Sequence, residues 1–297
     1  MRIVITGKEG QVVRSLIERA ARYPDIDIIA LGRPELDLFD TSTIASAILA
    51  ATPDIVVSAA AYTAVDRAED EPGLAYAINV VGAGAVARAA SQLGIAVIHL
   101  STDYVFAGEG LEPYLESDET GPQGVYGQTK LDGEFAVRKA NPRHVILRTA
   151  WVYSPFGKNF LKTMLRLAES RDTVSVVSDQ WGNPTSAFDV ADAIIEVAKH
   201  LNANGSFAGY GIYHVVGTGS INWSGFARAI FASSRHYGGP FANVVDIVST
   251  DYPTKAKRPL NSRLSTNKFL HTFGWRAPDW QVSKDATVVR VLSEAKG

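Results

Sequence analysis

Short β-branched runs alternate with longer alanine-rich stretches of helical periodicity through the first half of this 297-residue chain. We predict strands at residues 2–6, 26–31, 54–58, 96–100 and 144–147. Between them we predict helices at residues 11–21, 41–51, 73–93 and 126–139, each long enough to cross over a sheet. Parallel strands joined by right-handed helical crossovers predict an α/β fold with a doubly wound parallel sheet.

The alternation weakens after about residue 159. We predict helices at residues 159–171, 189–201, 222–234 and 281–294, with short strands at 174–177, 212–216 and 244–248. Glycine and proline cluster in loops between them, but no segment has the composition of a linker. We therefore predict a Rossmann-type domain at residues 1–158, with sheet contributions from later segments. Residues 159–297 are predicted to form a smaller α/β lobe that packs on it and mainly binds substrate.

Composition excludes several classes of function. The 29 Lys and Arg residues nearly balance the 31 Asp and Glu residues, so the net charge of −2 provides no overall attraction to nucleic acid or an anionic membrane. The absence of cysteine excludes a disulfide framework, a thiolate metal site and a cysteine nucleophile. The N-terminus does not resemble a signal or transit peptide, and no apolar run approaches the roughly 20 residues of a membrane helix. We expect a cytoplasmic protein without nucleic-acid or membrane partners.

A glycine-rich turn, TGKEGQ, follows the first predicted strand and leads into a helix. Gly7 and Gly10 permit a tight turn, and the N–H groups at the helix start, near Gln11, can bind a pyrophosphate. A third glycine would stand at position 13, but the chain has Val13, so looser packing of helix on strand is expected. The turn predicts a dinucleotide site, with a plain strand-to-helix turn as the alternative.

The end of the second predicted strand bears on the choice of dinucleotide. In NAD-selective sites an acidic residue, about 20 residues past the glycines, accepts from the ribose 2′-hydroxyl. Arg33 stands there instead, and a cation suits a 2′-phosphate. This favours NADPH, while the nearby Glu35 and Asp37 keep NADH possible. A solvated loop cation is the alternative role for Arg33.

Tyr126 and Lys130 stand four residues apart at a predicted helix start, so their side chains share one face. A neighbouring lysine cation stabilises a phenolate and lowers a tyrosine pKa from its usual value near ~10. Tyr126 can then pass a proton to a carbonyl oxygen as hydride arrives. The same spacing also occurs by chance on surface helices.

Other strand ends add polar and small side chains to the same edge of the sheet. Thr102, after the fourth predicted strand, can hydrogen-bond the same carbonyl oxygen, and we assign the adjacent Asp103 to substrate binding. Ala59, Ala60 and Ala61 follow the third strand, where small residues let a nicotinamide or its ribose lie against the backbone. Small core packing is the other explanation for the alanines.

These motifs carry a resemblance to a known superfamily. TGKEGQ, AAAYTAVD at 59–66, STDYVF at 101–106 and YGQTK at 126–130 resemble the extended short-chain dehydrogenase/reductases. More narrowly, LSTDYVFAG, DQWGNPT at 179–185 and KRPLNSRL at 257–264 are similar to the dTDP-4-dehydrorhamnose reductase family. The resemblance spans nearly the whole chain, and the last two motifs single out this branch.

The resemblance implies an oxidoreductase with a catalytic triad of Thr102, Tyr126 and Lys130, in which Lys130 also touches the nicotinamide ribose. It implies reduction of dTDP-4-dehydro-L-rhamnose to dTDP-L-rhamnose with NADPH, a step toward rhamnose-containing polysaccharide. It also implies Trp151 beside the sugar and Asn159, with its neighbour Phe160, near the diphosphate. A buried packing role remains the alternative for Trp151.

A basic loop is a candidate diphosphate contact. It contains Lys255, Lys257, Arg258 and Arg263 in a chain without net positive charge. Phosphates would find paired donors there, although a solvated loop would explain the same charges. We expect Arg258 to contact the phosphate or the sugar of the substrate.

One departure from the family bears on metal binding. Several members have a glutamate in the helix after the glycine turn that helps to bind magnesium at a dimer interface, but Ser15 stands there in this chain. Phe188 stands where a second acid is expected. Without these oxygen ligands a magnesium site is doubtful, and we predict no metal and either a monomer or a homodimer.

Three other functions stay open at this point. A sister ketoreductase would give another 6-deoxyhexose epimer, and an epimerase would keep tightly bound NAD. A non-catalytic regulatory subunit with this fold would bind the cofactor without consuming it, although retention of Thr102, Tyr126 and Lys130 argues against that.

Overall fold

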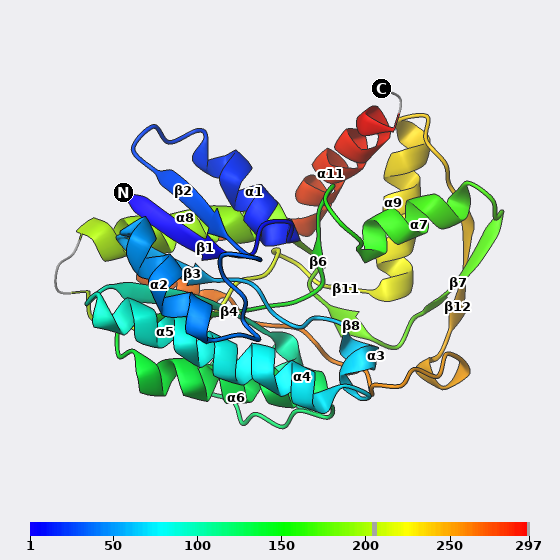
Figure 1. Ribbon diagram of the computed structural model, residues 1–297. Helices are drawn as coiled ribbons and strands as arrows, with labels where there is room; N and C mark the ends of the chain where they lie inside the picture. The colour runs from blue at the N-terminus through cyan, green and yellow to red at the C-terminus, as the bar shows by residue number, and fades with distance from the viewer. Residues whose placement is uncertain (204–206, 296–297) are drawn as a thin grey trace.

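The computed structural model describes residues 1–203 and 207–295, and its centre is a parallel sheet (Figure 1). The six strands lie in the order β10-β5-β4-β3-β1-β2, and every neighbouring pair is parallel. Their bounds are β1 Arg2–Thr6, β2 Asp27–Leu31, β3 Ile55–Ser58, β4 Ala96–Thr102, β5 His144–Thr149 and β10 Gly211–His214. The prediction of an α/β fold with a doubly wound parallel sheet is confirmed.

Side-chain alternation along the strands explains why helices cover both faces of this sheet. Ile3 and Ile5 of β1 pack in one core cluster with α1 (Gln11–Ala20) and α8 (Ala187–Ala203), whereas Val4 packs in another. The second cluster contains α2 (Ser42–Ala51), α5 (Ala83–Gln92) and Val137 of α6 (Val125–Ala140). Both faces of the sheet are therefore buried beneath helices, as expected for parallel sheets.

The helix predicted at 73–93 is present but irregular. It consists of α4 (Pro72–Tyr76), a π-helical stretch at Ala77–Gly82 and α5. By length and apolarity the stretch Pro72–Gln92 could cross a membrane, but 61% of its most apolar window is buried inside the protein. The apolar character is therefore explained by packing against the sheet and α6.

The second half of the chain builds a smaller lobe around its own core, on the right of Figure 1. The parallel pair β7–β12 and three helices enclose this core. Their bounds are α7 Phe160–Ala168, β7 Thr173–Val177, α9 Trp223–His236, β12 Asn243–Ile247 and α11 Trp280–Glu294. Between these elements the chain returns to the first lobe with α8, β10 and α10 (Asn267–Phe273). The domain division at 158/159 stays a prediction.

Several short elements were not predicted from the sequence. They include α3 (Val65–Ala68), the two-residue strand pairs β6 (Val152–Tyr153) with β9 (Thr185–Ser186) and β8 (Trp181–Gly182) with β11 (Ile221–Asn222), and two 3₁₀ turns at Asp103–Val105 and Ser249–Asp251. The two strand pairs depend on contacts between distant segments, which local periodicity does not encode.

Candidate active site

A cleft opens where the strand order reverses. The chain runs from β1 to β2 on one side and then to β3 on the other, so the connections after β1 and β3 diverge. Thr6 ties these strand ends together, because its Oγ1 accepts from the N–H groups of Ala59 and Ala60 at 3.0 Å each. Cavities of about 730 and 980 Å³ meet here and share the glycine turn and residues 60–61 as lining. Together they form one continuous cleft.

The glycine turn fits a pyrophosphate. Gly7 has φ +98°, which is left-handed backbone that favours glycine. Gly10 is the N-cap of α1 and has no side chain to occupy the N–H groups of the first turn. The Val13 side chain packs beneath the turn, where its Cγ2 would lie 3.5 Å from a Cβ at either glycine. The turn is therefore shaped for close approach of a ligand to the backbone.

Arg33 lies at the far end of the cleft, in the wall of the second cavity. Glu35 and Asp37, the two acids that kept NADH possible, both interact with other groups of the protein. Glu35 is ion-paired with Lys8 at 2.6 Å, which lowers the pKa of its carboxyl, and Asp37 Oδ1 accepts from the N–H of Phe39 at 3.0 Å. The ion pair neutralises Glu35 together with Lys8, and Arg33 remains in the cavity wall.

The three residues of the predicted triad lie together at the end of the cleft opposite Arg33. Thr102, Tyr126 and Lys130 all line the first cavity, with the glycine turn and Ala59, Ala60 and Ala61 between them and Arg33. Helix α6 begins at Val125, so Tyr126 and Lys130 share its cleft-facing side as predicted. Lys130 is buried, and its Nζ donates to the carbonyl oxygen of Leu100 at 2.7 Å.

Burial sets the protonation of these two groups. It lowers the pKa of Lys130 to about 8, opposed by the nearby carboxylate of Glu134. It raises the pKa of Tyr126 above its ordinary value, opposed by a hydrogen bond with Thr102. The spacing argument expected Lys130 to lower the tyrosine pKa, but in the free protein desolvation of the phenol outweighs any such effect. Tyr126 is thus held as a neutral phenol, the form that can donate a proton.

The carboxylate of Asp103 contacts the side chain of Thr102. Thr102 Oγ1 donates to Asp103 Oδ1 at 3.0 Å, and the 3₁₀ turn that follows buries the carboxyl. Burial raises the pKa of Asp103 to about 6, opposed by hydrogen bonds from Ser262 and Thr102. Its Oδ2 is buried and has no hydrogen-bond partner among residues 1–203 and 207–295.

Two supporting contacts were missed at the sequence level. Asn79, in the π-helical stretch, donates to Thr129 Oγ1 at 3.1 Å, and Thr129 Oγ1 donates to the carbonyl of Tyr126 at 3.0 Å. Glu134 forms a buried two-point ion pair with Arg148 of β5, at 2.7 and 2.9 Å. The glutamate one turn after Lys130 was a signal that could have been noticed, whereas the arginine partner required the fold.

Trp151 lies at the cavity wall and also packs on a second tryptophan, and its contact with the sugar stays a prediction. It lines the first cavity, and its ring also stacks on Trp223 with centroids 3.5 Å apart and planes 9° apart. Its φ of +49° is unusual for a bulky residue, and a Cβ at Gly182 would meet its ring at 2.3 Å. Such strained backbone is typical of sites where a side chain must be presented in one direction.

Asn159 and Arg258 lie near the cleft but outside the lining of its two cavities. Asn159 caps α7 by accepting from the N–H of Lys162, and its Nδ2 donates to Gln11 Oε1 at 2.9 Å. The side chain of Gln11 thus joins the glycine turn to the second lobe. Arg258 is ion-paired with Asp66 at 2.5 Å beside the hydroxyl of Tyr104. Substrate contact by Asn159 and Arg258 stays a prediction.

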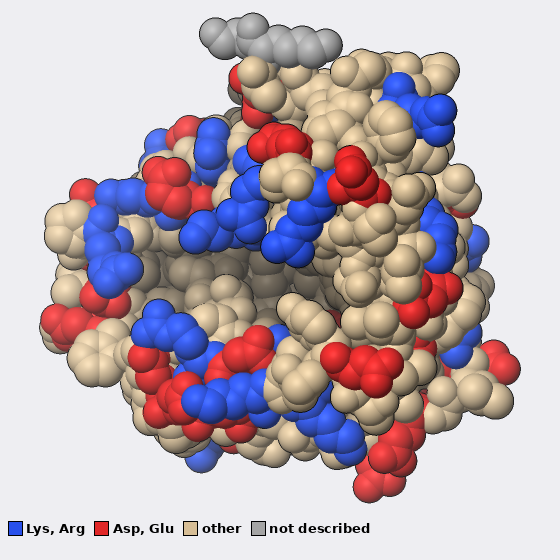
Figure 2. All heavy atoms as spheres, turned by 90° about the vertical axis from the view of Figure 1, so that its right-hand side faces the viewer, with Lys and Arg blue, Asp and Glu red and all other residues tan. Residues whose placement is uncertain are grey.

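Basic side chains surround the opening. Figure 2 shows a hollowed face with Lys and Arg gathered along both edges of the hollow. The basic residues that line the two cavities are Lys8, Arg33, Arg67, Lys130 and Lys158. The acids Glu9, Asp37, Glu71 and Asp103 line the same cavities, so the cations that could meet an anionic ligand are interspersed with carboxylates.

The residues at the position implied for magnesium do not fit a divalent cation. Ser15 is fully buried, and Phe188 is an aromatic ring beside the guanidinium of Arg19. In the part of the chain that the structure describes, no group of three His, Cys, Asp or Glu residues could hold a metal ion.

Comparison with known proteins agrees with this architecture. A family model described as the RmlD substrate binding domain matches residues 1–293. A dTDP-4-dehydrorhamnose reductase of Sinorhizobium fredii is 50% identical over 296 residues, which cover 100% of this chain and 99% of the relative. A dTDP-4-dehydrorhamnose reductase structure from Clostridium acetobutylicum has a TM-score of 0.91 at 35% identity, covering 98% of this chain and 100% of that one. A Bacillus anthracis dTDP-4-dehydrorhamnose reductase solved in complex with NADP has a TM-score of 0.89 at 35% identity, covering 97% and 99%.

Proposed function

Because the chain belongs to the dTDP-4-dehydrorhamnose reductase family, we propose that it reduces the 4-keto group of dTDP-4-dehydro-L-rhamnose to give dTDP-L-rhamnose, with NADPH as the preferred reductant. One observation carries the proposal. A single cleft runs from Arg33, past the glycine turn, to a neutral phenol at Tyr126 that is backed by Thr102 and Lys130. We place this activity in the cytoplasm, where nucleotide sugars are made.

The roles of the chain's own residues follow from their surroundings. Tyr126 donates its phenol proton to the carbonyl oxygen at C4, and Lys130, at the same end of the cleft, stabilises the phenolate that remains. Thr102 orients the carbonyl oxygen from the strand end, while Asp103 and Trp151 hold the sugar. NADPH, when bound, would supply the hydride. The proton from Tyr126 completes the reduction.

The diphosphate end of the substrate is assigned to the second lobe and the basic loop. Arg258 lies beside the hydroxyl of Tyr104, and Tyr104 lines the first cavity, so we assign the guanidinium to a phosphate bound at this end. Lys158 lines the first cavity, and the adjacent Asn159 is the N-cap of α7 and contacts Gln11. These substrate-binding roles are proposals that rest on position.

The decisive experiment is NADPH oxidation on addition of dTDP-4-dehydro-L-rhamnose, followed by NMR of the product. We expect stoichiometric oxidation and the L-rhamno product. Oxidation with a different configuration at C4 would assign the chain to a sister ketoreductase. Binding of NADPH without consumption would replace the proposal with the non-catalytic subunit.

Replacement of Arg33 tests the cofactor preference. We expect Arg33→Ala to weaken NADPH binding about tenfold, since a charge-assisted contact to the 2′-phosphate is lost, and to leave NADH binding unchanged. Fluorescence titration of each cofactor measures this without the sugar substrate. Arg22→Ala, a surface arginine outside both cavities, is the matched control. Equal weakening of both cofactors by Arg33→Ala would contradict a 2′-phosphate contact.

The pKa of Lys130 predicts an alkaline limit to activity. Because burial lowers this pKa to about 8, the ammonium is lost above that pH, and kcat/KM should fall as the pH rises through 8. In Lys130→Arg the guanidinium stays charged, so we expect a lower rate without the alkaline fall. Measuring kcat/KM from pH 6 to pH 10 separates the two enzymes. A fall near pH 8 that persists in Lys130→Arg would assign it to another group.

A further inference from the structure

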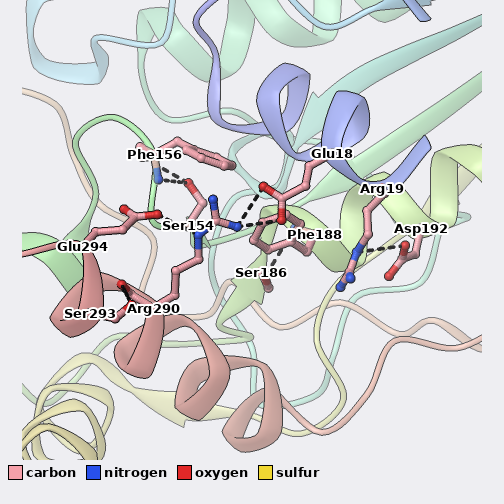
Figure 3. A network of polar contacts seen from close by, with 10 residues as sticks. All are labelled: Glu18, Arg19, Ser154, Phe156, Ser186, Phe188, Asp192, Arg290, Ser293 and Glu294. Carbon is pink, nitrogen blue, oxygen red and sulfur yellow. Dashed lines mark hydrogen bonds and ion pairs between the residues drawn. The ribbon is translucent and has the colours of Figure 1, made fainter. Parts of the chain in front are cut away.

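An arginine in the last helix crosses to the first helix (Figure 3). Arg290 of α11 donates from Nη1 to both carboxylate oxygens of Glu18 in α1, at 2.6 and 2.8 Å. Its Nε donates to Glu294 Oε1 at 2.8 Å. One guanidinium therefore pairs with two carboxylates and joins a helix of the cofactor side to a helix of the second lobe, 272 residues apart in sequence.

Two aromatic rings complete the cluster. The Arg290 guanidinium lies 4.9 Å from the ring centroid of Phe156 and 5.5 Å from that of Phe188. Arg14 lies over Phe156 at 4.1 Å, and Arg19 lies over Phe188 at 4.8 Å. Figure 3 shows Arg290 passing between Phe156 and Phe188 toward α1. Cation–π contacts of this kind stabilise a guanidinium.

This is the region where the family resemblance implies magnesium. Ser15 and Phe188 stand at the two positions expected to be acidic, and the Ser15 hydroxyl is buried with no partner in the described ranges. The acids that remain nearby, Glu18 and Glu294, are already ion-paired with Arg290. A hard cation needs several free oxygen ligands and would face the surrounding guanidinium groups here.

The cluster also supports the wall of the cleft. The N–H of Phe156 donates to Ser154 Oγ, which in turn donates to Gln11 Oε1 at 2.8 Å. Gly157 and Lys158, the next residues, line the first cavity opposite the glycine turn. A contact that fixes the Phe156 ring therefore fixes the segment that joins Gln11 to the second lobe.

We propose that Arg290 takes the place of the divalent cation in this chain: it clamps α1 to α11 within one subunit, makes the protein independent of metal, and positions the segment 154–158 against the cofactor end of the cleft. Arg290 is a positioning residue, because it touches neither the reacting atoms nor the cavity lining. The proposal does not require the sugar reduction to be correct, since each of its consequences can be measured without the sugar.

The test combines variants with metal addition and removal. We expect the wild-type Tm to be the same with EDTA or with magnesium chloride. Arg290→Gln should lower Tm by roughly 2–6 °C and weaken NADPH binding several-fold, whereas Arg290→Lys should lose less because one donor can still reach Glu18. In the double variant Glu18→Gln/Arg290→Gln, the second substitution should add little to the first, because both remove the same contact.

Arg228→Gln is the matched control, because it breaks an exposed arginine–aspartate pair, to Asp246, on the second lobe alone. It should move Tm by no more than about 1 °C and leave NADPH binding unchanged. A wild-type Tm that falls with EDTA or rises with magnesium would overturn the proposal, since a bound ion stabilises by mass action. The proposal that Arg290 clamps α1 to α11 would be overturned if the Tm changes of Glu18→Gln and Arg290→Gln were fully additive. It would also be overturned if Arg290→Gln left NADPH binding unchanged.

Discussion

Tyr126→Phe should lower kcat by roughly 10² to 10⁴-fold while NADPH still binds with near-normal affinity. The phenol is the proton donor that we propose at the end of the cleft, and phenylalanine keeps the ring but removes the proton. Stopped-flow measurement of NADPH oxidation, with fluorescence titration of the cofactor, separates the chemical step from binding.

Tyr104→Phe is the matched control for this loss. Tyr104 lies edge-on to Tyr126 with ring centroids 5.5 Å apart, it lines the same cavity, and its own hydroxyl is hydrogen-bonded with Arg258. Removing that hydroxyl disturbs packing and solvent to a similar degree but takes away no proton donor of the reaction. We expect at most a small change in kcat for Tyr104→Phe. Near-normal turnover in Tyr126→Phe would remove Tyr126 from the chemistry.

Glu134→Ala should destabilise the protein by about 3–5 kcal/mol, the largest effect on stability that we expect from a single exchange. Its side chain is 1% exposed and that of Arg148 is 3% exposed, so the substitution leaves a buried guanidinium without its counter-charge. Ser101 also loses its acceptor, because its hydroxyl donates to Glu134 Oε1 at 2.5 Å. Urea unfolding followed by circular dichroism gives the free energy of unfolding.

Two further variants identify the cause of that loss. The double variant Glu134→Leu/Arg148→Met replaces both charges by apolar groups and should recover much of the stability, as buried pairs often do when replaced together. Asp27→Asn breaks the exposed pair with Arg2 and should cost no more than about 1 kcal/mol. If Glu134→Ala costs no more than Asp27→Asn, the buried pair does not stabilise the fold as argued.

Local pattern explains how much of the site could be predicted. Gly7, Thr102 and Tyr126 stand at ends of strands or at the start of a helix, and parallel strands bring their carboxyl ends to one edge whatever the details of packing. Periodicity and turn chemistry are enough to find such positions. The positions of Thr102 and Tyr126 at this edge could therefore be predicted from the sequence, whereas their role as a triad with Lys130 is what the family resemblance implies.

Contacts between distant segments could not be predicted from local sequence pattern. The pairing of Gln11 with Asn159 and of Asp66 with Arg258 depends on how the second lobe closes over the first. The pKa of Tyr126 was expected to move in the opposite direction, because spacing shows its lysine neighbour but not how deeply the phenol is buried. Burial is a property of the whole fold, so residue spacing alone cannot supply it.

The return of α8 and β10 to the first lobe restricts how this protein can be divided or recombined. β10 pairs with β5 at the edge of the main sheet, and α8 packs against α1, although both come from the second half of the chain. A fragment ending at residue 158 would lack an edge strand and the helix that covers one face, so it should not persist as a stable proteolytic core. Grafting a foreign substrate lobe onto this sheet would require several chain crossings to be exchanged at once. Substrate preference in this scaffold is therefore more readily altered by exchanging single side chains at the cleft than by exchanging whole modules.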